Sequence, residues 1–448
     1  MVHEALRTLV DALEVVRPAF TRPGFANLVV VFAGWALTSG PHAVTQALVT
    51  TGVAGRRHHE AFHRFFSRGT WDPDEVGRLL FGWIARHLRE GAAVRVALDD
   101  TLATKKGPHV FGIGSHLDAV RSTRRQKIFA FGHCWVVLAV LLPVPFSSRV
   151  FALPVLFRLY RTVKSCERSG QPHRKKTELA REMLDVLATW VGARRVEVAA
   201  DSAYCNDTVT RGLPDTFVLF GAMRPDAVLT ALPPARRRRS GRPSKRGRPV
   251  AKPEVIAKDG RRPWLSCEAT IYGARRTVRY KTVDAQWYRA CGVRLLRIVI
   301  VQVDGGAIGM RVFFSTDATV AVPIILETYA GRWAIEVCFR DLKQLLGFGD
   351  SSARKRAAVE RTAPFVGLIY TTLVLWFTEG VHRTRIATPP LRPWYRHKQG
   401  LCFADVLRAA QRALMPLDVL DPRRSLANLR KRRPPSAWPR ESRFGLAA

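Results

Sequence analysis

The sequence predicts an α/β fold with a central sheet, a helical region before it and a mainly β insertion within it. Three observations lead to this prediction. Residues 1–90 carry apolar side chains at helical spacing. Residues 91–202 interleave short apolar strands with a helix over 177–193. Residues 203–320 have mostly strand patterns, and helical periodicity returns at 321–348.

Composition points to a globular protein with a polyanionic partner. The 448 residues include 47% hydrophobic ones, enough for two or three domains with buried cores. Lys and Arg number 72 and Asp and Glu 36, which gives a net charge of +36. Such an excess is most simply explained by binding to nucleic acid, with an anionic membrane surface as the weaker alternative.

Cysteine usage and the N-terminus favour a cytoplasmic location. The seven cysteines are odd in number and form no CxxC pair, which argues against a disulfide framework or a structural zinc site. Glu4 and Asp11 interrupt any signal-peptide profile. The apolar stretch Ile128–Phe146 is long enough for a bilayer, but its Gly and Pro residues also fit a buried strand with a turn. We therefore expect no membrane partner.

The N-terminal helices have recognisable starts. Asp72, Pro73 and Glu75 form a helix start with an Asp cap, Pro at the first position and Glu at the third. Residues 1–90 contain 10 basic and 8 acidic residues, so the large positive charge lies elsewhere in the chain.

Acidic residues follow two of the predicted strands. The strand Val94–Leu98 stops at Asp99 and Asp100, and the strand Val196–Val198 stops before Asp201. The carboxyl ends of strands in open α/β sheets are where sites form, although a single Asp at such a point is more often a turn or cap residue.

The insertion contains a strongly basic segment. Residues 234–262 hold 12 basic and 2 acidic residues with many Pro and Gly, so we expect a mobile loop. Residues 401–448 are expected to form a C-terminal helical segment and a basic tail.

A predicted helix over 329–346 carries four polar residues on one face. Tyr329, Arg332, Glu336 and Lys343 fall within about 60° of one another at 100° per residue. A neighbouring apolar stripe would pack on the sheet, which puts the polar stripe at the rim of a cleft. The alternative is a solvated face with an Arg–Glu pair.

Three acidic residues from two strands and a helix suit metal-dependent chemistry. Together they can hold two divalent cations about 4 Å apart on a phosphodiester, and carboxylates suit Mg²⁺. An acidic cluster in so basic a chain is what a DNA-cutting enzyme needs.

The motifs resemble a known family. Tyr329-x2-Arg332-x3-Glu336-x6-Lys343 resembles the YREK signature of DDE transposases of bacterial insertion sequences. The strings ALDDT at 97–101 and AADS at 199–202 resemble the first and second acidic motifs of that family, in the same order.

This resemblance implies a fold and an activity. The fold is an RNase H-like catalytic domain, formed here by residues 91–202 and 321–400 and interrupted by the mainly β insertion at 203–320. Residues 1–90 would be a helical DNA-binding domain that reads terminal inverted repeats. The activity is metal-dependent DNA cleavage and strand transfer.

The resemblance also implies roles for individual residues. Asp100, Asp201 and Glu336 would bind two Mg²⁺ ions, with Mn²⁺ as a substitute, although Asp99 remains an alternative to Asp100 because neighbouring strand residues point to opposite faces. Arg332 and Lys343 would contact DNA phosphates near the cut, and Tyr329 a phosphate of the terminal nucleotides. Relatives stack a flipped base on an aromatic ring, for which Trp264 and Trp287 are candidates.

Two AT-hook-like elements lie in the basic segment. Arg242 stands in a Gly-Arg-Pro triplet, and Arg246 and Arg248 belong to the string Arg-Gly-Arg-Pro. They would enter a narrow A·T minor groove or act as a basic linker held by phosphate attraction. Either interpretation predicts contact with DNA.

The expected partners are double-stranded DNA, as element ends and target, and a second copy of the chain that makes a homodimer on DNA. The expected location is the cytoplasm, in association with the nucleoid. Two alternatives remain: a non-catalytic DNA-binding descendant of a transposase, and a structure-selective nuclease with the same fold.

Overall fold

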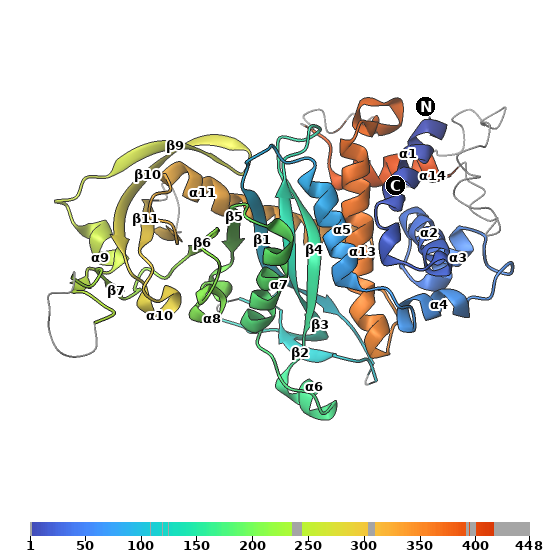
Figure 1. Ribbon diagram of the computed structural model, residues 1–448, viewed down its shortest axis with the longest axis horizontal. Coiled ribbons are helices and arrows are strands. Elements are labelled where there is room, and N and C mark those ends of the chain that lie inside the picture. Colours follow the sequence, from blue (N-terminus) through green and yellow to red (C-terminus); the bar gives the residue numbers. More distant parts are fainter. Residues whose placement is uncertain are drawn as a thin grey trace.

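The computed structural model describes residues 2–107, 109–118, 120–123, 125–234, 244–302, 310–390, 394 and 400–415. Helices gather at one end of the elongated molecule and surround the middle of the sheet (Figure 1). The helices are α1 (Val2–Glu14), α2 (Arg22–Leu37), α3 (Val44–Thr50), α4 (Glu60–Ser67), α5 (Pro73–Ala85), α6 (Val163–Arg168), α7 (Lys176–Val191), α8 (Asp207–Thr210), α9 (Pro253–Lys258), α10 (Tyr288–Cys291), α11 (Val322–Gly331), α12 (Trp333–Leu345), α13 (Arg356–Thr378) and α14 (Phe403–Leu414). The strands are β1 (Val94–Thr104), β2 (Gly114–Leu117), β3 (Phe129–Leu142), β4 (Phe151–Tyr160), β5 (Val196–Ala200), β6 (Phe217–Ala222), β7 (Leu229–Thr230), β8 (Pro249–Val250), β9 (Leu265–Ile271), β10 (Ala274–Ala285), β11 (Leu296–Gln302) and β12 (Arg311–Ser315).

One mixed sheet of ten strands runs through the molecule, in the order β2-β3-β1-β5-β6-β12-β11-β10-β9, with β4 also paired to β3. Strands β4, β3 and β1 pair antiparallel, whereas β1, β5 and β6 pair parallel. This mixed sheet with its covering helices is consistent with an RNase H-like fold. Strand β6 lies within the range predicted for the insertion but pairs directly with β5. Strands β12 to β9 then extend the same sheet, so the insertion is continuous with the central sheet.

Strand β1 is longer than predicted. The sequence pattern suggested an end at Asp99 and Asp100, yet β1 pairs with β3 as far as Thr104 opposite Gly132. The two acidic residues are therefore extended strand residues with alternating side-chain directions. The phase of that alternation decides which of them reaches a given face of the sheet.

The apolar stretch at 128–146 is a strand and not a membrane helix. Strand β3 is buried continuously from Gly132 onward. His133 is buried within it, and its Nε2 lies 2.9 Å from the carbonyl oxygen of Phe111. Burial lowers the pKa of His133 to about 4, so the ring is neutral. Within the described part of the chain, none of the helices has the length and apolar character needed to span a bilayer.

The N-terminal helices share their core with the rest of the molecule. Helices α1 to α5 are present, and α5 begins as predicted, with the Asp72 side chain accepting a hydrogen bond from the Asp74 N–H at 3.0 Å. The Trp35 indole donates to the Leu346 carbonyl at 2.8 Å, and the Trp376 indole donates to that of Ala5 at 3.1 Å. Their buried apolar residues belong to the same cluster as those of the sheet. These helices are thus docked on α12, α13 and α14, with no separate core of their own.

The basic segment 234–262 is partly ordered, which corrects the expectation of a mobile loop. Strand β8 pairs with β7, and helix α9 buries Ile256, which is 1% exposed. Periodicity missed these elements because each spans only two to six residues. Residues 235–243, including Arg242, and the tail beyond residue 415 lie outside the described residues.

Helix α5 is predicted to depend on one of its two glycines. A Cβ on Gly77 would lie 2.1 Å from the Val155 carbonyl oxygen of β4, whereas a Cβ on Gly82 meets nothing within 4 Å. Gly77→Ala must push α5 off the sheet, and we expect it to lower the free energy of unfolding by about 1–3 kcal/mol or more. Gly82→Ala, at an exposed position of the same helix, should raise it by up to about 1 kcal/mol. Urea denaturation of the two variants measures this difference, and equal stability would contradict the packing of α5 on β4.

Candidate active site

The strands β1 and β5 bring two carboxylates together. Their parallel register pairs Leu98 with Ala200, so that Asp99 and Asp201 come one residue later at matching positions. Matching residues on neighbouring parallel strands project from the same face of a sheet. Asp201 also caps the following 3-10 turn, since its Oδ2 accepts a hydrogen bond from the Ala203 N–H at 3.4 Å. Asp99 and Asp201 are therefore on one face, at the carboxyl end of β5.

Helix α12 adds an arginine and a third carboxylate to this face. Arg332 precedes the first residue of the helix, and Glu336 lies one turn further on. The Arg332 guanidinium donates through Nη1 to Asp99 Oδ2 at 2.5 Å and through Nη2 to Glu336 Oε1 at 2.8 Å. The Arg332 side chain is 12% exposed. One buried guanidinium thus links β1 to α12.

The electrostatics of the group show an excess of negative charge. Burial raises the pKa of Asp99 to about 7 even though Arg332 opposes the shift, and the neighbouring Asp201 and Asp100 raise it further. Burial would lower the pKa of Arg332, but Asp99, Tyr329, Glu336 and Asp201 together raise it. A single guanidinium therefore faces three carboxylates in a site with restricted access to water.

The structure brings Asp99, and not Asp100, to this group. Asp100 points to the other face of β1, where it accepts hydrogen bonds from Lys176 Nζ at 2.6 Å and from the Tyr204 hydroxyl at 2.7 Å. The Cys134 thiol lies 3.3 Å from the same carboxylate. The predicted ligand Asp100 therefore lies on the opposite face of β1 from Glu336, because strand alternation separates the adjacent residues.

Tyr329 and Lys343 have different positions relative to the acids. The predicted helix over 329–346 is broken at Arg332, so Tyr329 lies on α11, with Arg332 5.7 Å from its ring centroid. Burial raises the pKa of Tyr329, Arg332 opposes the rise and Asp201 adds to it. Lys343 is two turns beyond Glu336 and lines a cavity of about 440 Å³ together with His42 and other residues of α12, α14 and the loop after α2. It contacts none of the three carboxylates.

The remaining predicted residues lie outside this group. Arg246 stacks on the Tyr288 ring, with its guanidinium carbon 4.0 Å from the centroid, and Arg248 is exposed beside β8. Trp264 packs against Lys281, and Trp287 against Phe314 in the interior of the insertion. The sequence did not predict that Lys176 and Tyr204 bind Asp100. The only signals were that Lys176 lies near a predicted helix start and that Tyr204 follows Asp201 closely.

The three carboxylates suit a hard divalent cation, but in the structure two of them bind Arg332. Asp99, Asp201 and Glu336 offer only carboxylate oxygens, which are the ligands that Mg²⁺ prefers. Within the ranges that the structure describes, no three His, Cys, Asp or Glu side chains stand close enough to hold a metal ion. In the structure the Arg332 guanidinium itself binds Asp99 and Glu336.

Comparisons with known proteins cover most of the chain. The family model described as DDE superfamily endonuclease matches residues 17–289, and the model of the archaeal putative transposase ISC1217 matches residues 290–378. Neither description is that of the bacterial YREK branch. No curated protein matches the chain. A solved structure, the cryo-EM structure of the piggyBac transposase synaptic complex with hairpin DNA, is similar with a TM-score of 0.44 and 11% sequence identity. That match covers 94% of this chain and 78% of the piggyBac chain.

Asp100 is predicted to stabilise the fold. Asp100→Asn removes the counter-charge of the half-buried Lys176 and should lower the free energy of unfolding by about 1–3 kcal/mol. Asp185→Asn is the matched control, since it breaks the exposed ion pair of Arg181 with Asp185 on the same helix α7, and should change stability by less than about 0.5 kcal/mol. Urea denaturation in the presence of EDTA compares the two. Equal stability of both variants would remove the structural role assigned to Asp100.

Proposed function

The chain belongs to the DDE superfamily endonucleases, and from this premise we propose that it is a DNA transposase of an insertion sequence. It would bind the terminal inverted repeats of the element and catalyse metal-dependent cleavage and strand transfer. The observation that carries the proposal is the convergence of Asp99, Asp201 and Glu336 on Arg332. Membership of the YREK branch is part of the proposal and rests on the residues Tyr329, Arg332, Glu336 and Lys343.

We assign the three carboxylates to metal binding. Asp99, Asp201 and Glu336 would hold Mg²⁺ as two ions, or Mn²⁺ in their place. When bound, these ions supply activation of the attacking oxygen and stabilisation of the leaving oxygen. The ratio of three carboxylates to one guanidinium supports this assignment, because a bound divalent cation would offset the negative charge that remains beside Arg332.

The chain's own cations would orient the DNA. Once a cation takes the carboxylates, the Arg332 guanidinium is available for a phosphate oxygen, for which its planar donor pair is suited. Lys343 would contact a phosphate further along the same face of α12. Tyr329 would donate a hydrogen bond to a phosphate of the terminal nucleotides from its position beside Asp201.

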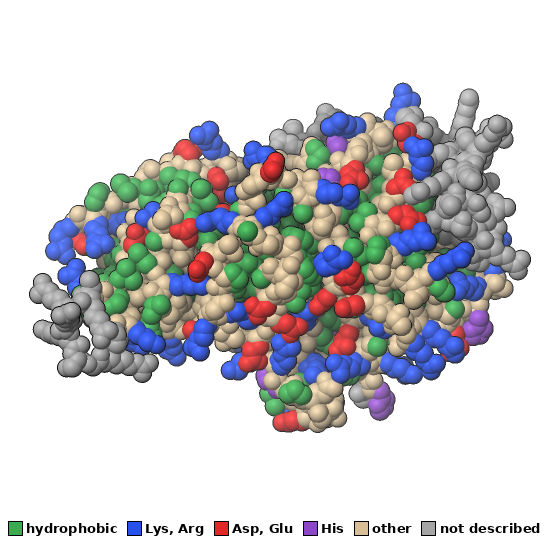
Figure 2. Space-filling view, viewed as in Figure 1, with side chains coloured by type: hydrophobic (Ala, Val, Ile, Leu, Met, Phe, Trp, Pro, Cys, Tyr) green, Lys and Arg blue, Asp and Glu red, His purple; other side chains and the backbone are tan. Residues whose placement is uncertain are grey.

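The N-terminal helices would contribute to binding of the element ends. The region 1–90 is nearly neutral as a whole, but its charge is unevenly distributed. Basic side chains gather around α4, visible at the lower right of Figure 2, with Glu60 as the one acidic residue among them. These are Arg56, Arg57, His58, His59, His63, Arg64 and Arg68. Such a patch favours contact with DNA phosphates. Double-stranded DNA, a homodimer on DNA and a nucleoid-associated cytoplasmic location complete the proposal.

The proposed activity is tested by cleavage of a DNA fragment that carries the flanks of the gene. Wild type with Mg²⁺ should cut at the element boundaries, while Asp99→Asn, Asp201→Asn and Glu336→Gln should each lose at least about 100-fold in rate because each removes a metal ligand. Asp100→Asn is the matched control, with the same chemical change one residue away, and should keep cutting when assayed below its unfolding temperature. Mapping of cut sites on labelled strands gives the measurement.

Other outcomes separate the alternatives. Binding without cuts in both Mg²⁺ and Mn²⁺ would identify a non-catalytic descendant. Cuts confined to branched DNA, with no preference for the element ends, would identify a structure-selective nuclease. Loss of cutting in Asp100→Asn with retention in Asp99→Asn would reverse the assignment of the first carboxylate.

Divalent cations are expected to stabilise the folded chain. A ligand that binds only the folded state adds about 2.7 kcal/mol at 100 times its Kd, so Mn²⁺ should raise the midpoint of thermal unfolding of wild type. Asp99→Asn and Asp201→Asn should remove most of that increase, whereas Asp100→Asn should keep it. EDTA should return wild type to its metal-free midpoint. A shift that is equal in all four proteins would contradict cation binding at this site.

A further inference from the structure

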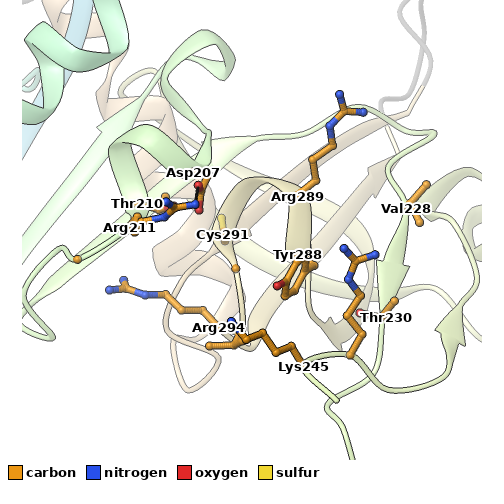
Figure 3. A pocket seen from close by; sticks show the side chains of 14 residues that line it. Asp207, Thr210, Arg211, Val228, Thr230, Lys245, Tyr288, Arg289, Cys291 and Arg294 are labelled. Atoms are coloured by element: carbon orange, nitrogen blue, oxygen red, sulfur yellow. Dashed lines mark hydrogen bonds and ion pairs between the residues drawn. The ribbon is translucent and has the colours of Figure 1, made fainter. Parts of the chain in front are cut away.

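A basic cavity lies in the insertion, away from the carboxylate group. It has a volume of about 820 Å³ and is bounded by α8, α10 and the chain around Lys245 (Figure 3). Its lining includes five basic side chains and one acidic one, namely Arg211, Lys245, Arg246, Arg289, Arg294 and Asp207. The concentration of one sign of charge in a concave surface indicates an anionic ligand.

Most of the positive charge in this cavity lacks an acidic partner. Asp207 pairs with Arg211, its neighbour one turn along. Arg294 donates to the Leu213 carbonyl at 3.0 Å, and Arg246 stacks on the Tyr288 ring. Within the described chain, no carboxylate forms an ion pair with Lys245, Arg246, Arg289 or Arg294. Four cations are therefore available to a ligand.

Backbone hydrogen bonds and close packing fix the wall of the cavity. The Gly247 N–H donates to the Ala231 carbonyl at 2.9 Å, and the Ala231 N–H donates to the Arg248 carbonyl at 2.9 Å. A Cβ on Gly247 would lie 2.2 Å from the Leu232 carbonyl oxygen, so only glycine allows this close approach. These contacts hold Lys245 and Arg246 beside α10. Opposite them, the buried Thr210 hydroxyl donates to the Ala290 carbonyl at 2.8 Å and joins α8 to α10.

The cavity is close to the carboxylate group along the chain. Helix α8 begins at Asp207, six residues after Asp201. Six extended residues span at most about 22 Å, which corresponds to about six base pairs of DNA at 3.4 Å each. In the turn between them, the Cys205 thiol donates to the Asp201 carbonyl at 3.4 Å. The edge of the cavity at Asp207 therefore lies within about 22 Å of Asp201.

We propose that this cavity binds the sugar–phosphate backbone of DNA within about six base pairs of the cleaved bond. The guanidinium groups offer planar donor pairs for phosphate oxygens, and an arginine stacked on a tyrosine also presents a flat surface to a base. The proposal rests on the proposed function, because it takes the ligand to be the DNA that the carboxylates act on. A free nucleotide shares the phosphate chemistry, and the experiment separates the two sources.

The experiment measures binding of a duplex with the gene's own flank at several salt concentrations, in EDTA so that no cutting occurs. The double variant Arg246→Gln/Arg289→Gln should bind about 10- to 100-fold more weakly than wild type. The slope of log affinity against log salt should fall by about 1 to 2, because each phosphate that the protein no longer neutralises reduces it by about 0.9. The matched control is Arg276→Gln/Arg279→Gln, which removes the same charge from exposed positions on β10 of the same insertion.

A second arm locates the bound phosphates. Uncharged methylphosphonates placed within six base pairs of the cut should weaken wild-type binding, and the cavity variant should lose this sensitivity. Equal losses in both double variants would show general electrostatic attraction and overturn the proposal. Tight binding of ATP that depends on Arg246 and Arg289, with DNA binding unchanged by the variant, would also overturn it. Wild type that neither binds nor cuts the flank would instead contradict the proposed function itself.

Discussion

The register between β1 and β5 is the constraint on which the rest of the site depends. Because the strands are parallel and Leu98 pairs with Ala200, Asp99 and Asp201 project side by side from one face. A shift by one residue would send Asp99 to the face of α7 and bring Asp100 toward α12. The antiparallel pairing of β1 with β3 on its other side, from Val96 to Thr104, holds this register against slippage. The pairing of the strands therefore determines which carboxylates belong to the acidic group.

Arg332 then balances part of the charge that the register creates. Carboxylates this close would repel each other in a buried site, and the guanidinium that bridges Asp99 and Glu336 reduces that cost. Burial nevertheless outweighs the influence of Arg332 and raises the pKa of Asp99 to about 7. The break between α11 and α12 at Arg332 puts this residue at the helix end, from where it reaches β1.

The continuity of the fold links distant parts of the chain to the same site. The N-terminal helices are fixed to α12 and α13 by indole hydrogen bonds from Trp35 and Trp376. The insertion continues the central sheet through β6 and β12, and its basic cavity is lined by α8, which begins six residues after Asp201. Basic surfaces on both flanks are therefore attached to the acidic group through regular secondary structure. This arrangement suits a long polyanion that contacts several surfaces at once.

The sequence by itself determined the α/β class and the basic character, and it predicted that Asp201, Glu336 and Arg332 act together. These follow from helical spacing, from strands that end at acidic residues and from the signature string, all of which are local patterns. The choice between Asp99 and Asp100 came only from tertiary structure. Strand β1 is buried on both faces, so its apolar run Val96–Leu98 has no polar alternation from which the phase could be read.

The sequence also did not predict that β6 pairs with β5. Strand β6 is a buried apolar run, and such a run fits either a core strand or an insertion strand. The docking of the N-terminal helices and the cavity beside α10 depend on contacts between residues far apart in sequence, such as Trp35 with Leu346, and local patterns carry no information about those contacts.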